Sequence, residues 1–304
     1  MGQTTRSYIA GFFQMALDGE RNLSYLKRVN GGLEHQEFAQ EGFGDDNKRL
    51  IHGTVANIDE ISFEFGMAGA APILKWIKES WDKDFGRRSG QIDHADFNTN
   101  IVLTQEFSNA LITETTFPTL DGSANENAYL RVKFMPEGVD SNRAGGKLDG
   151  DAFVDEKQWN CSLFRFSIDD VPGVEYSNRI ESFSVKQKVM KLATGEARFP
   201  ELFPVALEFP QIVGTVAEAY GAGLWDWHDE YIRKGRRDPK ALKTAHLEIL
   251  APDMSVLWRV NFFHVGLKKL EVADSTANSG QIKRLKYTLT VESMELDGRY
   301  GFET

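Results

Sequence analysis

Apolar residues stand at every second position in two short segments that lie far apart in the chain. A turn sequence follows each segment, Asp18-Gly19 in one case and Pro172-Gly173 in the other. Strict alternation is typical of a β-strand with one buried face, and Gly or Pro directly after it indicates a turn. The alternating positions are Phe13, Met15 and Leu17 in the first segment, and Phe164, Phe166 and Ile168 in the second.

The same spacing of 151 residues, from Phe13 to Phe164, recurs at a predicted amphipathic helix. Pro72 suits the first turn of the earlier helix. Both helices run into Gly-Arg-Arg, at 86–88 and 235–237. Because Gly accepts a left-handed C-cap and Arg complements the helix dipole, we expect two helix stops. An intermolecular salt-bridge site is the alternative. The apolar stripes consist of Ile73, Trp76, Ile77 and Trp81, and of Leu224, Trp227 and Tyr231.

Three further strands are predicted after each helix. Their apolar positions match between the halves at a spacing of 146 residues for two strands and 157 for the last. Five elements in the same order indicate a tandem duplication. The Gly- and Asp-rich stretch 143–155 suits an interdomain linker, so we expect domains at 1–150 and 151–304. The matched pairs are Ile101/Leu247, Leu103/Ile249, Leu111/Leu257, Phe117/Phe263, Leu130/Tyr287, Val132/Leu289 and Phe134/Val291.

Many strands with a single helix in each half favour a mainly β fold with some α structure. We expect two tandem antiparallel β-barrels, each flanked by one amphipathic helix. An alternating α/β sheet would need more helices.

Composition narrows the class of protein without naming it. The net charge of −10, divided as −7 in the first half and −3 in the second, argues against tight binding to nucleic-acid phosphates. The single cysteine, Cys161, excludes an internal disulfide framework and is expected to be a small core residue. With no apolar leader and no long apolar run, we expect a protein made in the cytoplasm and not inserted in a membrane.

The residues give no indication of catalysis, and we predict no catalytic, cofactor-binding or metal site and no cofactor. None of the six histidines forms a metal pair, and the nucleophile-elbow and phosphate-loop motifs are missing from the sequence. The closest approach to a ligand cluster, 93–96 with the sequence Asp-His-Ala-Asp, is expected to be a solvated loop. A carboxylate pair assembled only by folding would not be visible in the sequence.

Trp225 and Trp227 stand about 200° apart on a helix, so one narrow stripe cannot bury both. One is expected to pack on its own barrel. The other is expected at an interface with a neighbouring subunit or with the sister domain, or else in the internal core.

The second half resembles the tail-tube proteins of contractile phages and the inner-tube proteins of contractile injection systems, which are related in fold to the tube protein of type VI secretion. The match covers most of 158–298 and rests on an ordered set of motifs. The first half matches only through the internal repeat, and it lacks the Arg-Arg-Asp and the hairpin Trp. The motifs are Leu224-Trp225-Asp226-Trp227, Gly235-Arg236-Arg237-Asp238, the strand 247–250, Trp258 with Phe262 in the strand 256–262, and the closing strand 285–294.

The resemblance implies rings of six barrels stacked into a tube around a channel, inside a sheath. Self-association into rings is then expected, as a trimer with pseudo-sixfold symmetry or as a hexamer. Sheath and baseplate proteins are the other partners, and DNA or protein cargo passes the channel without specific binding. The mature protein would belong to a virion tail or an injection particle. Alternatives are a tube-related end piece, such as a hub, initiator or terminator, and more distantly a β-barrel ligand-binding protein or enzyme.

Overall fold

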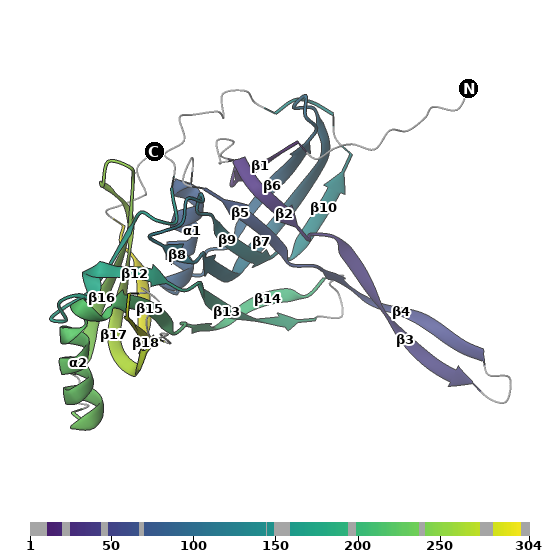
Figure 1. Ribbon diagram of the computed structural model, residues 1–304. Coiled ribbons are helices and arrows are strands. Elements are labelled where there is room, and N and C mark those ends of the chain that lie inside the picture. The colour runs from purple at the N-terminus through teal and green to yellow at the C-terminus, as the bar shows by residue number, and fades with distance from the viewer. Residues whose placement is uncertain are drawn as a thin grey trace.

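The computed structural model consists of two units of the same topology, joined by strands that cross from one to the other (Figure 1). The first unit is formed by 11–148 and the second by 159–298. The predicted boundary at 150/151 lies outside the described residues and stays a prediction. The structure describes residues 11–19, 25–43, 48–66, 70–143, 145–148, 159–193, 199–236, 241–273 and 282–298.

In the first unit, six strands follow one another in the order β7-β6-β1-β2-β5-β9, and β9 pairs back onto β7. This last pairing closes the sheet into a barrel, which leaves the ring of six strands without a free edge. Strand β10 extends the pairing of β9 along β7. The bounds are β1 Phe12–Leu17, β2 Tyr25–Asn30, β5 Ile61–Phe65, β6 Arg88–Ala95, β7 Ile101–Phe117, β8 Leu120–Asp121, β9 Leu130–Met135 and β10 Gly138–Asn142.

In the second unit, the order is β11-β16-β17-β18-β15-β12, and β19 extends the pairing along β17. No pairing joins β11 to β12 within the described residues. Instead β12 pairs with β8 of the first unit, so this barrel is nearly closed. The bounds are β11 Phe164–Ile168, β12 Ser177–Ile180, β15 Ile212–Ala217, β16 Lys243–Leu250, β17 Val256–Val272, β18 Arg284–Thr290 and β19 Ser293–Leu296.

The hydrogen-bonded register confirms the duplication. From β6 to β10, all strand pairs except Asn142–Thr104 recur in the second unit 155 residues later, and even the register shift between Ile112 and Glu114 returns between Leu267 and Lys269. From β1 to β5 the spacing is 151. Corresponding pairs are Gly90–Phe107 and Ala245–Phe262, Ile112–Phe134 and Leu267–Leu289, and Met15–Ile92 and Phe166–Leu247.

The predicted spacings of 146 and 157 are therefore wrong. Ile101 corresponds to Val256 and not to Leu247, and Leu130 corresponds to Leu285 and not to Tyr287. A slip of two residues leaves an alternating pattern unchanged, which explains the false match in the last strand. The spacing of 146 matched the start of β7 to β16, because neighbouring strands of one barrel carry the same alternation, and it matched the end of β7 to β17 nine residues out of register.

Helix α1 (Ala71–Trp81) begins with Pro72 in its first turn and buries Ile73, Trp76, Ile77 and Trp81, as predicted. It ends well before Gly86, with Lys83 at a positive φ of 65°, so the predicted stop at 86–88 is wrong. Helix α2 (Ala222–His228) continues into a π-helical turn, Asp229–Arg233, and here Gly235 has the predicted left-handed conformation, with a φ of 66°.

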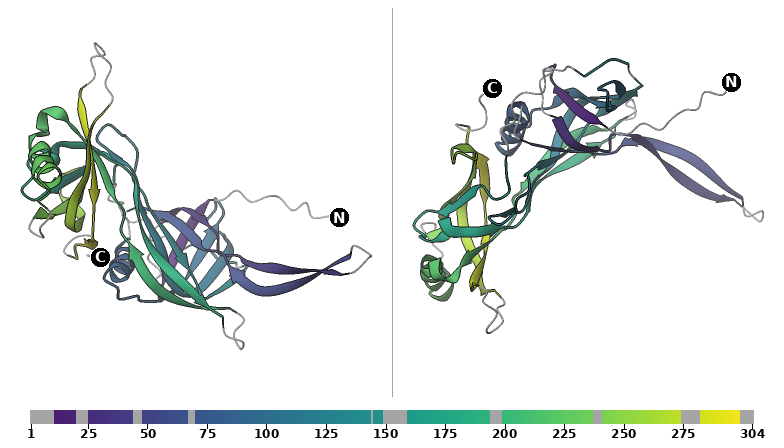
Figure 2. Two further views of the ribbon diagram at one scale, coloured as in Figure 1. Left: turned by 90° about the horizontal axis from the view of Figure 1, so that it is seen from below. Right: turned by 45° about the horizontal axis from the view of Figure 1, so that its top comes forward.

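One hydrophobic cluster runs through both units. Each unit also carries a long hairpin, and the two lie very differently (Figure 2). We call β3–β4 the arm; among the described residues its strands pair only with each other. We call β13–β14 the internal hairpin, because β13 pairs with β7 of the first unit. The bounds are β3 Glu34–Phe43, β4 Lys48–Ile58, β13 Phe183–Leu192 and β14 Glu201–Glu208.

Candidate assembly surfaces

The internal hairpin joins the two units through backbone pairing. Phe183 stands opposite Phe117, and the pairing continues to Lys186 opposite Glu114. Strand β7 therefore carries β6 and then β13 along one edge, while β9 and β10 follow its other edge. The second unit thus completes a sheet of the first, and the contact is head to tail because the two partners contribute different elements.

Phe117 lies at the centre of this junction with 1% of its side chain exposed. Its ring stacks on Phe183 with centroids 4.5 Å apart and an interplanar angle of 12°. It also contacts Trp258 of β17 at 5.5 Å and Trp81 of α1 at 5.9 Å. Since these rings come from both units, the units share one aromatic core.

Polar contacts fix the position of the internal hairpin. The Thr116 and Ser184 hydroxyls lie 2.8 Å apart, and the buried Ser80 hydroxyl donates to Gln187 at 2.6 Å. Near the tip, the Leu202 N–H donates to the Glu137 carboxylate at 2.9 Å. Separating the units would break these hydrogen bonds and exchange them for hydrogen bonds to water.

The junction changes the pKa of the Glu114 carboxylate. Burial, the largest single effect, would raise its pKa, but it is outweighed by the sum of the hydrogen bond and charge of Lys133, at 2.5 Å, and the contributions of Ser184 and Lys186 of the internal hairpin. The pKa of Glu114 is therefore held below its ordinary value, and the ionised form favours the joined state.

Arg87 belongs to the junction, which answers the question left open by the two Gly-Arg-Arg sequences. Its guanidinium donates to the Leu202 carbonyl, lies 3.6 Å from Glu137 and stands over the ring of Phe203. Arg88 instead pairs within its own unit. In the second sequence Arg236 pairs with Glu230, and 237–238 lie outside the described residues.

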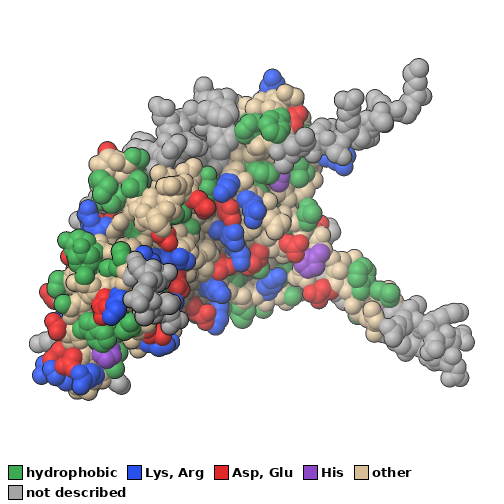
Figure 3. Space-filling model, in the orientation of Figure 1, with side chains coloured by type: hydrophobic (Ala, Val, Ile, Leu, Met, Phe, Trp, Pro, Cys, Tyr) green, Lys and Arg blue, Asp and Glu red, His purple; other side chains and the backbone are tan. Residues whose placement is uncertain are grey.

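The arm projects from the first unit, on the side away from the second unit (Figures 1 and 2). Hydrophobic side chains are exposed along it in the space-filling view (Figure 3). Leu33 at its base is 58% exposed, and Phe38 and Ile51 on its two strands are 62% and 59% exposed. Apolar side chains displayed on an unpaired hairpin are typical of a segment that a partner covers.

Strand β17 has a free segment at the far end of the molecule. Its residues Leu267–Val272 pair with β18 on one side. On the other side β16 pairs only as far as Val265, and no strand of the described chain follows it. We call this side the open edge. Val272 there is 54% exposed, whereas Phe117, its equivalent in β7, is buried.

The two tryptophans of α2 separate as their spacing requires. Trp227 is buried, with its ring 6.1 Å from that of Tyr231, while Trp225 remains 42% exposed. The prediction that one packs on its own barrel is confirmed. The exposed indole of Trp225 keeps the outer face of α2 a candidate contact surface.

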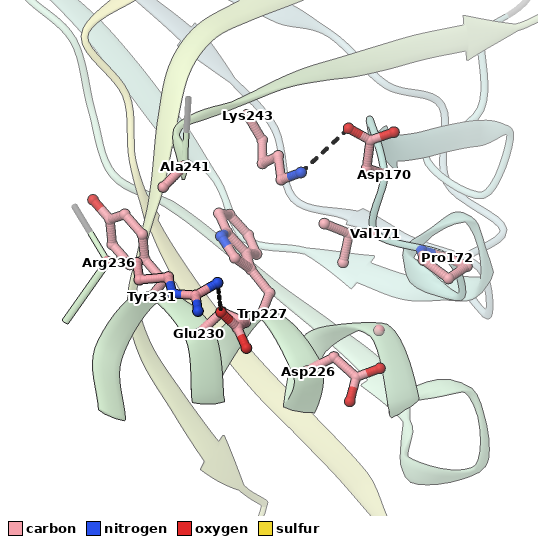
Figure 4. Close-up of a pocket in the computed structure, with 11 residues that line it drawn as sticks. Asp170, Val171, Pro172, Asp226, Trp227, Glu230, Tyr231, Arg236, Ala241 and Lys243 are labelled. Carbon is pink, nitrogen blue, oxygen red and sulfur yellow. Dashed lines mark hydrogen bonds and ion pairs between the residues drawn. The ribbon is translucent and has the colours of Figure 1, made fainter. Parts of the chain in front are cut away.

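A pocket of about 440 Å³ lies between α2 and the turn after β11 (Figure 4). Two ion pairs close its rim: Lys243 with Asp170 at 3.2 Å, and Arg236 with Glu230 at 2.7 Å. Trp227 forms an apolar wall. With its cations already paired, the pocket has the character of a structural crevice.

The expectation of a solvated loop at 93–96 is wrong, because the first three of these residues lie in a strand. Asp93 and His94 lie in β6 and not in a solvated loop, and Asp93 is buried, accepting from Thr104 at 2.5 Å. Desolvation lowers the pKa of His94, which bonds to Gln105 at 2.9 Å. Each of the two groups is therefore satisfied by a separate hydrogen bond to β7.

Cys161 is buried, as predicted, and burial raises the pKa of its thiol. No group of three or more His, Cys, Asp or Glu side chains suited to a metal occurs among the described residues. Within the same residues, no helix is long and apolar enough to cross a membrane.

The arm and the open edge are not among the features predicted from the sequence. A signal was present, because the segments 34–58 and 183–208 occupy the same place in the two halves. The arm lacks the apolar alternation that marks the barrel strands, so its pairing becomes visible only in the structure.

No protein-family model matches the sequence, and no curated protein matches it either. Among solved structures, the chain is similar to a chain of the sheath-tube complex of an extracellular contractile injection system (PVC) in its extended state, with 17% identity and a TM-score of 0.41. That alignment covers 46% of this chain and 95% of the other.

Two further similarities have the same extent. A chain of the anti-feeding prophage (AFP) baseplate is 16% identical, with a TM-score of 0.41, over 46% of this chain and 97% of the other. Hcp1 from Flavobacterium johnsoniae is 13% identical, with a TM-score of 0.31, over 45% of this chain and 98% of the other. Each alignment spans about the length of one unit. The solved structures similar to this chain thus include components of contractile injection systems and Hcp1.

Proposed function

We propose that this chain is a structural subunit of a contractile phage tail or a phage-tail-like injection particle. Its copies form the inner tail tube by ring assembly and stacking around a central channel. One observation carries the proposal: the two units join head to tail through the internal hairpin, while in the described part of the chain no further strand pairs with the arm or with the open edge. A head-to-tail contact that repeats from chain to chain generates a ring or an open helix.

Because each chain contains two units, the number of copies in a ring differs from the number of barrels. Three copies would place six barrels around the channel with pseudo-sixfold symmetry, and six copies would make a double-layer ring. In either case the internal junction supplies every second contact between barrels. Its shared aromatic core, centred on Phe117, suits a permanent joint that must carry load.

The proposal includes partners and a place of action. Sheath and baseplate proteins would contact the outer and end surfaces of the tube. DNA or protein cargo would pass the channel without specific binding. The chain would be made and assembled in the host cytoplasm, and its role there is structural and not catalytic.

A second role, that of a tube-related end piece, is favoured by a difference between the units. In the first barrel β1 pairs with β2, whereas the equivalent strands β11 and β12 do not pair with each other in the described chain, and β12 pairs with β8 of the first unit instead. A ring of three such chains has true threefold symmetry only. That symmetry suits a hub or initiator that joins a threefold part to a sixfold tube, or a terminator.

Electron microscopy of the purified chain, together with its mass in solution, tests the proposal. Stacked rings or tubes support the tube subunit, and single rings that do not stack support the end piece. A stable monomer at high protein concentration, seen as featureless particles, would refute both and favour a ligand-binding protein or enzyme.

A further inference from the structure

The arm and the internal hairpin are the same element in two environments. His35 pairs with Asn57 in the arm, and Lys186 pairs with Glu208 in the internal hairpin, each residue 151 positions later. Both hairpins shift register at the same step, before Phe38 in one and before Val189 in the other. The internal hairpin pairs with β7, whereas the arm has no such partner within the described chain.

Strands β7 and β17 are equivalent in the same way. On β7, the pairing with β6 ends at Ala110, and the internal hairpin then occupies the segment that ends at Phe117. On β17, the pairing with β16 ends at Val265, the residue equivalent to Ala110. The segment that follows, up to Val272, is the open edge.

We infer that the arm of one copy adds as an antiparallel strand to the open edge of a second copy of this chain, in the register of the internal junction. Inside the chain, Val185 stands opposite Thr115 and Lys186 opposite Glu114. The residue of β3 equivalent to a β13 residue lies 151 positions earlier, and the residue of β17 equivalent to a β7 residue lies 155 positions later. The proposed register therefore places Glu34 of one copy opposite Leu270 of the other, and His35 opposite Lys269. The inference rests on the proposed function only in that copies of the chain assemble.

Ile51 on β4, in the outer part of the arm, fits the same contact. Ile51 is equivalent to Leu202, which is buried and whose N–H donates to Glu137. Glu292 stands at the position equivalent to Glu137 and is exposed, in a pair with His264 at 3.3 Å. The proposed register therefore brings the exposed Ile51 to a surface that already carries the required carboxylate.

Charge also favours a second copy as the occupant. The described side chains of β3, at 34–40, include two glutamates and neither lysine nor arginine. The open edge presents Lys268, Lys269 and Glu271, with Lys269 2.7 Å from Glu271, so its net charge is positive. In the proposed register, Glu34 and Glu37 become diagonal neighbours of the two lysines across the strands, within reach of long side chains.

Pairing within one chain is excluded by distance. The arm points away from the second unit, and β17 lies at the opposite end of the molecule, in all three views (Figures 1 and 2). Each copy therefore donates one arm and offers one open edge, so the contact propagates from copy to copy.

Cysteine cross-linking tests the register. In a Cys161→Ala background, His35→Cys and Lys269→Cys place two thiols directly opposite each other at exposed positions. Opposite residues of an antiparallel pair lie within the Cα separation that a disulfide spans. Mild oxidation should convert most of the chain into a ladder of covalent multimers on a non-reducing gel. The two single variants, co-expressed, should stop at a covalent dimer.

The matched control is His35→Cys with Glu271→Cys, which moves one thiol two residues along the same face, to roughly 7–8 Å. We expect at least about tenfold less cross-linking from it. Equal cross-linking of both pairs would overturn the register. If the first double variant folds poorly, Glu34→Cys with Leu270→Cys repeats the test at the neighbouring pair.

Electron microscopy of the same samples separates the two proposals. Rings or tubes without the ladder would refute the pairing of arm and open edge, and leave the proposed function standing. The ladder without rings or tubes would support the pairing and count against a tube role. Monomers without the ladder would refute both.

Discussion

Replacing Phe183 by alanine should test whether the two units share one core. Phe183 belongs to the second unit, yet its ring stacks on Phe117 of the first, and its side chain is buried. Truncation of a buried phenylalanine costs about 3–5 kcal/mol of the free energy of unfolding, and about 0.5–1.5 kcal/mol of this comes from a well-placed aromatic pair. We expect a loss in that range.

Urea unfolding followed by tryptophan fluorescence measures this loss. Because Trp81 and Trp258 both contact Phe117, one from each unit, the natural chain should unfold in a single transition. Two protein concentrations separate folding from assembly, since association makes the midpoint depend on concentration. The control is Phe203→Ala on the same hairpin, where an exposed ring should cost about 1 kcal/mol or less.

The reasoning fails if Phe183→Ala costs less than about 1 kcal/mol, or no more than Phe203→Ala. It also fails if the natural chain unfolds in two transitions of similar size. Either result would mean that the units are stable separately and that the stacked rings contribute little.

Three further predictions concern single residues. The lowered pKa of Glu114 means that its ion pair with Lys133 stabilises the fold above the ordinary glutamate pKa, and that this contribution is lost as pH falls through the folded-state value; Glu114→Gln should therefore lower the urea midpoint at pH 7 and flatten its decline between about pH 5 and 3. The Cys161 thiol should react with a thiol reagent at least about a hundredfold more slowly in the native chain than in urea, since burial raises its pKa and hides it; rapid native labelling would contradict this. At the base of the arm, Gly31→Ala should lower the free energy of unfolding by about 1 kcal/mol or more, because its φ is 92° and a Cβ would meet the Glu60 carbonyl at 1.9 Å; an unchanged urea unfolding curve would show that the arm base readjusts freely.

Periodicity predicted the barrel strands and the buried helical faces well, and failed where the physical cause lies outside the local sequence. Trp76 and Trp227 were placed on buried stripes because a helix repeats every 3.6 residues, and both are buried. The stop assigned to Gly86 was wrong because the chain turns earlier, at Lys83. Because the helix ends before it, Arg87 lies outside the helix and contacts the second unit. No local sequence pattern predicts that contact.

The sequence by itself determined that this chain contains one barrel design twice, because buried faces impose alternation on every strand that lines a core. The tertiary structure decided how the two copies meet. Strands β3 and β13 hold equivalent places in the chain, yet β13 lies against β7 and β3 projects from the molecule. A strand can pair with a distant strand only if that strand has an unpaired edge close enough to contact. Which edges are unpaired and close is determined only when the whole chain has folded. The same reason makes the open edge, visible only in the structure, the place where a second copy is expected to bind.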